Sequence, residues 1–198
     1  MPDLLPKAAC IDAPDNHMPL TSYSTLVAGC EFVSLNPVAR EGCAQQRATS
    51  LAAKVHMRVT ANRIRELDRF LAVLLNDTAG QVSGAGHDAE MFDRISNTSK
   101  KLLVVEQLVG MAAADHDRLR AMGRIAARLR GPSHHWRAAS LVADMGIAGG
   151  EEAATAKKDL SHGKAIIPLS LNLATISSFY HDIGRRLIEK VGNKNYSP

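Results

Sequence analysis

Arginine is the residue type in this chain whose spacing most strongly suggests a chemical role. Between residues 118 and 143 there are six arginines and no acidic residue. They are Arg118, Arg120, Arg124, Arg128, Arg130 and Arg137. On a helix, at about 100° per residue, Arg120, Arg124 and Arg128 fall within about 80° of one face. A planar guanidinium can hold a phosphate through two parallel hydrogen bonds, so this arginine stripe predicts contact with a nucleic-acid backbone or another anion.

The arginine stripe has a second interpretation, in which its residues serve solvation or the fold. They could lie in solvent, or pair across space with the acids of residues 1–44 or with Glu151 and Glu152. Basic patches suggest a polyanionic partner without specifying one. Both interpretations therefore stay open from the sequence.

The stretch RLRGPSHHWR, residues 128–137, also has the outline of a helix-turn-helix. A first helix over residues 124–129 would stop at Gly131-Pro132, and a second helix would run from residue 133 to residue 142. Proline is unusual in such a turn, and serine is a good cap for the second helix. The residues predicted to face a groove of DNA are Ser133, His134, His135 and Arg137.

Another stretch, residues 169–186, contains the run from Asn172 to Ser177. This run resembles the turn and early recognition helix of many helix-turn-helix regulators, and the resemblance implies that Arg185 and Arg186 could meet phosphates. It departs from their pattern at Ser170, where glycine is usual. We favour the alternative, a last bundle helix with an apolar stripe in the core. That stripe is Leu171, Ile176, Phe179 and Ile183.

Metal ligands and nucleophiles are sparse in this sequence. His134 and His135 point about 100° apart on a helix, so they cannot readily close on one metal. Asp159 and His162 lie one turn apart, but no matching motif accompanies them. His162 could also be a phosphotransfer histidine, although no Gly-rich nucleotide motif occurs. The sequence therefore predicts no metal and no cofactor, and it supplies no enzymatic mechanism.

The composition predicts an all-α protein. The 198 residues are 45% apolar, 22% charged and only 4% aromatic, a balance that favours helices over strands. Cys10, Cys30 and Cys43 form no CxxC pair, which fits a reducing cytoplasm. No apolar run approaches the roughly 20 residues that span a bilayer, and the first residues lack a signal-peptide pattern. We expect a cytoplasmic protein with no membrane partner.

The apolar spacing predicts a long antiparallel helical hairpin. Residues 45–77 contain no Gly or Pro and repeat apolar residues at steps of three and four. After a turn over residues 78–88, with Asp88 as a cap, a second helix should run to about Arg130. Its apolar seam keeps the same steps, as in a coiled coil. The seam residues are Met91, Ile95, Thr98, Leu102, Val105, Val109, Ala112, His116 and Leu119.

Shorter elements complete the expected fold. Residues 1–44 contain five prolines and no sustained periodicity, so we expect an irregular N-terminal arm. Helices are expected over residues 133–145, over residues 151–162 and after Pro168, with a loop after the first of them. The sequence thus predicts one all-helical bundle domain over residues 45–198.

These observations support two hypotheses of function. In the first, a non-enzymatic regulator with a net charge of +4 binds DNA through the arginine stripe and forms a homodimer through the hairpin. Neither long helix can bury its apolar stripe alone, so the hairpin needs further helices, a second copy of the chain, or both, and we expect a homodimer. In the second, a helical adaptor or chaperone binds another protein through the hairpin, with exposed seam positions and no nucleic-acid contact.

Overall fold

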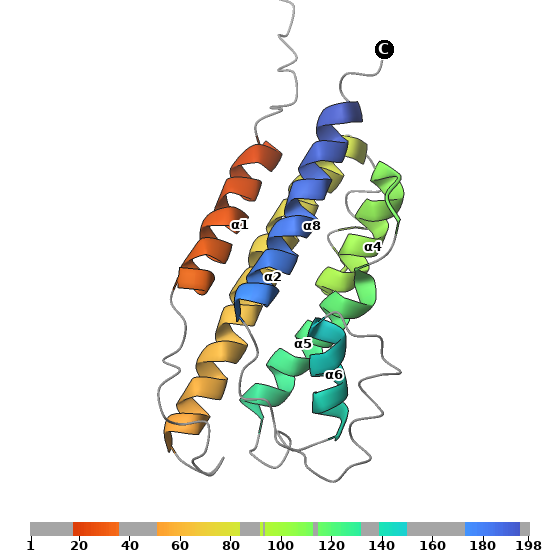
Figure 1. The fold of residues 1–198 in the computed structure, drawn as a ribbon. Coiled ribbons are helices and arrows are strands. Elements are labelled where there is room, and N and C mark those ends of the chain that lie inside the picture. Colours follow the sequence, from red (N-terminus) through yellow and green to blue (C-terminus); the bar gives the residue numbers. More distant parts are fainter. Residues whose placement is uncertain are drawn as a thin grey trace, which may run out of the picture.

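The computed structural model describes residues 18–35, 51–83, 92, 94–112, 115–131, 139–149 and 173–194. Within these ranges the chain forms six helices and no strand (Figure 1), which confirms the all-α prediction. The helices are α1 (Met18–Leu35), α2 (Leu51–Ser83), α4 (Thr98–Val109), α5 (His116–Arg130), α6 (Ala139–Gly149) and α8 (Leu173–Lys194).

Helix α1 corrects the prediction of an irregular arm, because residues 18–35 are helical. Pro19 lies in the first turn, where a missing N–H costs no hydrogen bond, and Pro37 lies beyond the last. The helix has one charged residue, Glu31, and apolar residues all around it, so no amphipathic period marks it in the sequence. Its buried apolar residues, at steps of four and three, are Leu26, Cys30 and Val33.

Two glycines allow α1 to lie close against α2 and α8. A Cβ atom at Gly29 would lie 2.6 Å from the ring of Phe70 on α2. A Cβ atom at Gly184 of α8 would lie 2.7 Å from Cδ2 of Leu26. Neither position can take a larger side chain without a shift of its neighbour, so both contacts depend on glycine.

Helix α2 extends further than the sequence predicted. The expected turn at residues 78–83 is helical, because Thr78 and Ala79 are buried against the other helices. Gly80 is exposed on the outside, where it costs only about 1 kcal/mol of helix propensity. Residues 84–91, including the predicted cap Asp88, lie outside the described residues.

The second long helix of the prediction is two helices, so that prediction is wrong. Helix α4 ends at Val109, and Gly110 follows in a left-handed conformation with φ 72°. The Met111 N–H then donates to the Glu106 carbonyl at 2.7 Å, which closes the helix end. On the predicted seam, Ala112 lies exposed in the link and His116 is half-buried. The seam residues that are buried are Thr98, Leu102, Val105, Val109 and Leu119.

Helix α6 continues through Gly149, so the predicted loop after Met145 is helical in its described part. Ala148 is buried there, and its carbonyl accepts a hydrogen bond from Arg118, which anchors this last turn. The predicted helix over residues 151–162 lies outside the described residues.

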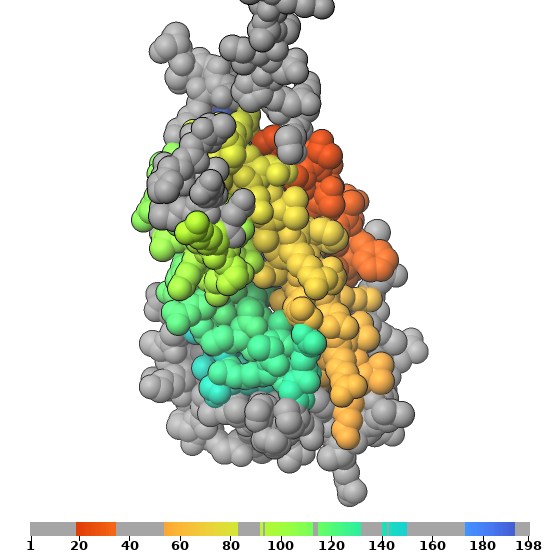
Figure 2. All heavy atoms as spheres, turned by 180° about the vertical axis from the view of Figure 1, so that it is seen from behind, coloured from red at the N-terminus to blue at the C-terminus, as the bar shows by residue number. Residues whose placement is uncertain are grey.

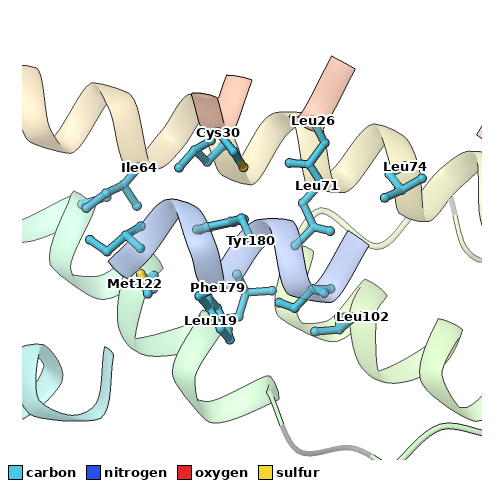
Figure 3. Packing of buried hydrophobic residues seen from close by; sticks show 14 of the residues in the cluster. Leu26, Cys30, Ile64, Leu71, Leu74, Leu102, Leu119, Met122, Phe179 and Tyr180 are labelled. Atoms are coloured by element: carbon cyan, nitrogen blue, oxygen red, sulfur yellow. The ribbon is translucent and has the colours of Figure 1, made fainter. Parts of the chain in front are cut away.

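Helix α8 runs through the middle of the bundle and packs against α1, α2 and α4. Figure 3 shows its Phe179 and Tyr180 among side chains from the surrounding helices, and Tyr180 is fully buried. This confirms the predicted last bundle helix, whose described apolar stripe is buried. None of the described helices is both long enough and apolar enough to cross a membrane.

Candidate nucleic-acid interface

Helix α5 carries the predicted arginine stripe and separates its apolar and basic residues cleanly. The apolar side is buried in contact with α2, and the helix also packs against α6. Its largest buried side chains are Leu119, Met122, Ile125 and Leu129. The helix ends at Arg130 with Gly131 as its cap, as the sequence predicted. The arginines therefore lie on the outer side of α5 and at its contact with α6.

Two arginines of the stripe pair with one carboxylate of α6. Arg124 donates from Nε at 2.9 Å and from Nη2 at 2.6 Å to Oδ1 of Asp144. Arg128 Nη1 donates to the other oxygen, Oδ2, and to the carbonyl of Ser140 at 3.0 Å. The Asp144 side chain is 7% exposed, so both of its oxygens are held by arginine inside the α5–α6 contact.

Arg118 is also part of the fold. Its Nε donates to the Ala148 carbonyl at 2.7 Å, and its guanidinium lies 4.2 Å from the ring centre of Phe179. Burial lowers the pKa of Arg118, and the carboxylates of Asp115 and Asp182 act in the opposite direction. Arg118 is thus a packing residue between α5, α6 and α8.

Arg120 and Arg130 remain in solvent. Both are exposed, and neither makes an ion pair within the part of the chain that the structure describes. The predicted groove-facing residues Ser133, His134, His135 and Arg137 lie outside the described residues. Arg118, Arg124 and Arg128 of the predicted interface therefore bond to other parts of the fold. Arg120 and Arg130 are exposed cations.

Helix α2 supplies further cations that the sequence analysis missed. Lys54 and Arg58 are exposed and Arg65 is half-buried, and the three fall within about 40° of one helix face. None of them makes an ion pair with a described residue, whereas Arg69 pairs with Glu66 at 2.8 Å. The i, i+4, i+11 spacing could have revealed this group. The acids Glu66 and Asp68 lie close by in sequence, so the segment does not stand out as basic.

The remaining cations lie on two neighbouring helices. Helices α2 and α5 pack against each other, and both can be seen from the side drawn in Figure 2, with α2 in orange to yellow and α5 in green to teal. We give the name α2–α5 basic face to the five cations Lys54, Arg58, Arg65, Arg120 and Arg130 of these two helices.

The structure tests the helix-turn-helix interpretation only in part, because residues 132–138 lie outside the described residues. After α5, the next described helix begins at Ala139, and it turns Leu141, Asp144 and Ala148 towards the bundle. Asp144 therefore meets the arginines of the first helix instead of facing a groove. In the other stretch that resembles a helix-turn-helix, residues 173–186 belong to one continuous helix whose apolar stripe is buried.

A separate group of charges lies where α4, α5 and α8 meet. Glu106 is 1% exposed, and its carboxyl oxygens have no hydrogen-bond partner among the described residues. Arg186 of α8 pairs instead with Asp115, just before α5. Burial raises the pKa of Glu106 to about 7, the charge of Asp115 adds to this, and Arg186 opposes it. No sequence pattern marked Glu106, because it shares its helix with the apolar seam.

Among the described residues, no three His, Cys, Asp or Glu side chains are grouped to hold a metal ion. His116 lies beside its neighbour Asp117, with Nδ1 at 3.4 Å from Oδ1. His162 lies outside the described residues.

Comparisons with protein-family models, with curated proteins and with solved structures found no match.

Proposed function

We propose that this protein is a non-enzymatic DNA-binding regulator that contacts the phosphate backbone through the α2–α5 basic face. The observation that carries the proposal is the placement of five cations on two adjacent helices. None of the five makes an ion pair with a described residue, although acids pair with other arginines nearby. Cations without a neighbouring acid on adjacent helices create a positive field that attracts a polyanion.

The chemistry of these side chains suits a phosphate backbone. Four of the five are arginines, whose guanidiniums can hold a phosphate oxygen pair bidentately. Each phosphate contact releases condensed counterions, so binding should weaken as salt rises, with a log–log slope of about −0.9 for each contact. Five contacts would give a slope of about −4 to −5.

Fluorescence anisotropy with a labelled DNA duplex between about 50 and 200 mM salt tests the proposal. The double variants Lys54→Gln/Arg58→Gln and Arg120→Gln/Arg130→Gln should each flatten the salt slope by about 2. The control is Arg185→Gln/Lys190→Gln, which removes two exposed charges from α8, the first of them paired with Glu189 at 3.0 Å. Helix α8 lies in front of α2 in Figure 1 and so on the side away from the view in Figure 2. If the control flattened the slope as much as either test variant, the binding surface would lie elsewhere.

The adaptor hypothesis has exposed apolar side chains in its favour, Phe32 of α1 and Val55 and Val73 of α2, but they lie off the predicted seam. It predicts exposed apolar seam positions, and Leu102, Val105 and Val109 are buried within the single chain. Further helices cover them, so burial of the seam does not require a second copy. The homodimer, the antiparallel hairpin and the cytoplasmic location stay predictions, and gel filtration with and without duplex DNA tests the first.

A further inference from the structure

Asp144 is bonded by Arg124 and Arg128, two residues of the arginine stripe that the sequence predicts to contact phosphate. Arg124 and Arg128 are one turn apart on α5, and together they bond both oxygens of this single carboxylate. A guanidinium pair that converges on two oxygens is also the arrangement that holds a phosphate. We call Arg124, Arg128 and Asp144 the α5–α6 clamp.

We infer that α6 is an autoinhibitory element, in which Asp144 competes with the phosphates of DNA for Arg124 and Arg128. The inference rests on the proposed function and adds its regulation. In the described state the clamp is closed on the carboxylate, and the α2–α5 basic face binds DNA without it. When α6 leaves α5, both guanidiniums join that face.

The exposure of the clamp allows an external anion to approach. The side chains of Arg124 and Arg128 are 38% and 26% exposed, whereas that of Asp144 is 7% exposed. Each arginine thus contacts the buried acid on one side and solvent on the other. Two positive charges face one negative charge, so the clamp keeps an excess of positive charge, which two adjacent phosphates of a DNA backbone would balance better.

The helix that carries Asp144 is the one whose own stability is lowest. With 11 residues, α6 is the shortest described helix, and it contains Gly146 as well as Gly149 at its end. Isolated helices below about 12 residues are marginal in water, and an interior glycine costs about 1 kcal/mol. Helix α6 packs mainly against α5 and only slightly against α8. Its docking therefore depends on the clamp, on the hydrogen bond from Arg118 to the Ala148 carbonyl and on the apolar contacts of Leu141 and Ala148.

The exchange is a shift between two populations. DNA gains two phosphate contacts only in molecules whose α6 has moved, so the apparent affinity is reduced by the fraction of chains in that state. Any change that removes the charge of Asp144 should release the arginines and tighten DNA binding.

The test compares Asp144→Asn with Asp117→Asn. Asp117 is exposed on α5 and bonds no arginine of the described residues, so its variant changes the net charge equally without opening the clamp. With a labelled duplex between about 50 and 200 mM salt, Asp144→Asn should tighten binding about tenfold and steepen the salt slope by about 2. Asp117→Asn should leave the slope unchanged. Adding Arg124→Gln/Arg128→Gln to Asp144→Asn should return the slope to that of the wild type.

The outcomes separate the inference from the proposed function. Wild-type binding with an unchanged slope in Asp144→Asn would overturn autoinhibition alone. Binding by Asp144→Asn but not by the wild type would support autoinhibition and overturn binding by the α2–α5 basic face. No binding by either chain would overturn both.

Hydrogen exchange on the unmodified protein keeps the test independent of how the variant folds. Saturation with duplex DNA should raise the exchange of α6 amides severalfold if DNA displaces Asp144. Unchanged or slower exchange in α6 of the DNA-bound protein would overturn autoinhibition.

Discussion

Two buried carboxylates in this bundle have opposite surroundings. Asp144 of α6 has both oxygens bonded by arginines, although its side chain is 7% exposed. Glu106 of α4 is 1% exposed and has no hydrogen-bond partner among the described residues. The arginine that acts on Glu106, Arg186, is paired with Asp115.

The difference between the two sites lies in partners and not in burial. A carboxylate taken out of water is costly unless cations and hydrogen bonds replace the water. Asp144 has those replacements from a neighbouring helix. Glu106 lacks them, and burial together with the charge of Asp115 raises its pKa to about 7. One acid therefore fastens two helices, while the other makes the bundle sensitive to pH.

The largest effect on stability is expected when Asp144, like Glu106, has no arginine partner. The variant Arg124→Met/Arg128→Met keeps the apolar stems of both side chains but leaves a buried carboxylate without a cation. The free energy of unfolding at neutral pH, measured by urea titration, should fall by about 3 kcal/mol. The control Arg120→Met, on the exposed side of the same helix, should change it by less than about 0.5 kcal/mol. Equal losses in both would show that the α5–α6 clamp does not hold the fold.

The reverse change relieves Glu106. The folded pKa is about 7 and the ordinary value is 4.5, so between these pH values the folded chain holds a proton that the unfolded chain has released. Stability therefore falls as pH rises from about 4.5 to about 7. Glu106→Gln removes this dependence and should be more stable than the wild type by about 2–3 kcal/mol at about pH 8. The two chains should converge near pH 4.5 in urea titrations.

A pH-independent difference between Glu106→Gln and the wild type would contradict this assignment. Glu31→Gln is a suitable control, because Glu31 is an exposed glutamate on α1 and makes no ion pair with a described residue. Its effect on stability should not reproduce the pH dependence of Glu106→Gln.

Much of the fold could be predicted because the period of the apolar residues indicates which face of a helix is buried. That signal found α2, α4, α5 and α8. It failed for α1, which is apolar on all sides and therefore has no periodicity to read. It also failed at Gly110, because the seam keeps its spacing from Val109 to Ala112 across the break while the backbone turns left-handed.

Less of the candidate interface could be predicted, because ion pairing depends on contacts between distant residues. The acid-free window ends at Ala143, and the acid that engages the stripe is the next residue, Asp144. Sequence alone could count charges but could not place α6 against α5. Arg120 and Arg130 make no ion pair with a described residue and are exposed, and the contact of α5 with α2 could not be read from the sequence either.

The smallest effect on stability is expected for Asp115→Asn, which makes Arg186 available to Glu106. The change removes a neighbouring negative charge and frees Arg186, so the pKa of Glu106 should fall by about one unit in a carbon-13 NMR titration of the carboxyl groups. At about pH 5 the variant loses only the partly exposed pair with Arg186, about 0.5–1 kcal/mol. At about pH 8 a new attraction between Arg186 and Glu106 should offset most of that loss. A Glu106 pKa that stayed at about 7 would mean that burial alone sets it, and the contrast with Asp144 would then be one of depth instead of partners.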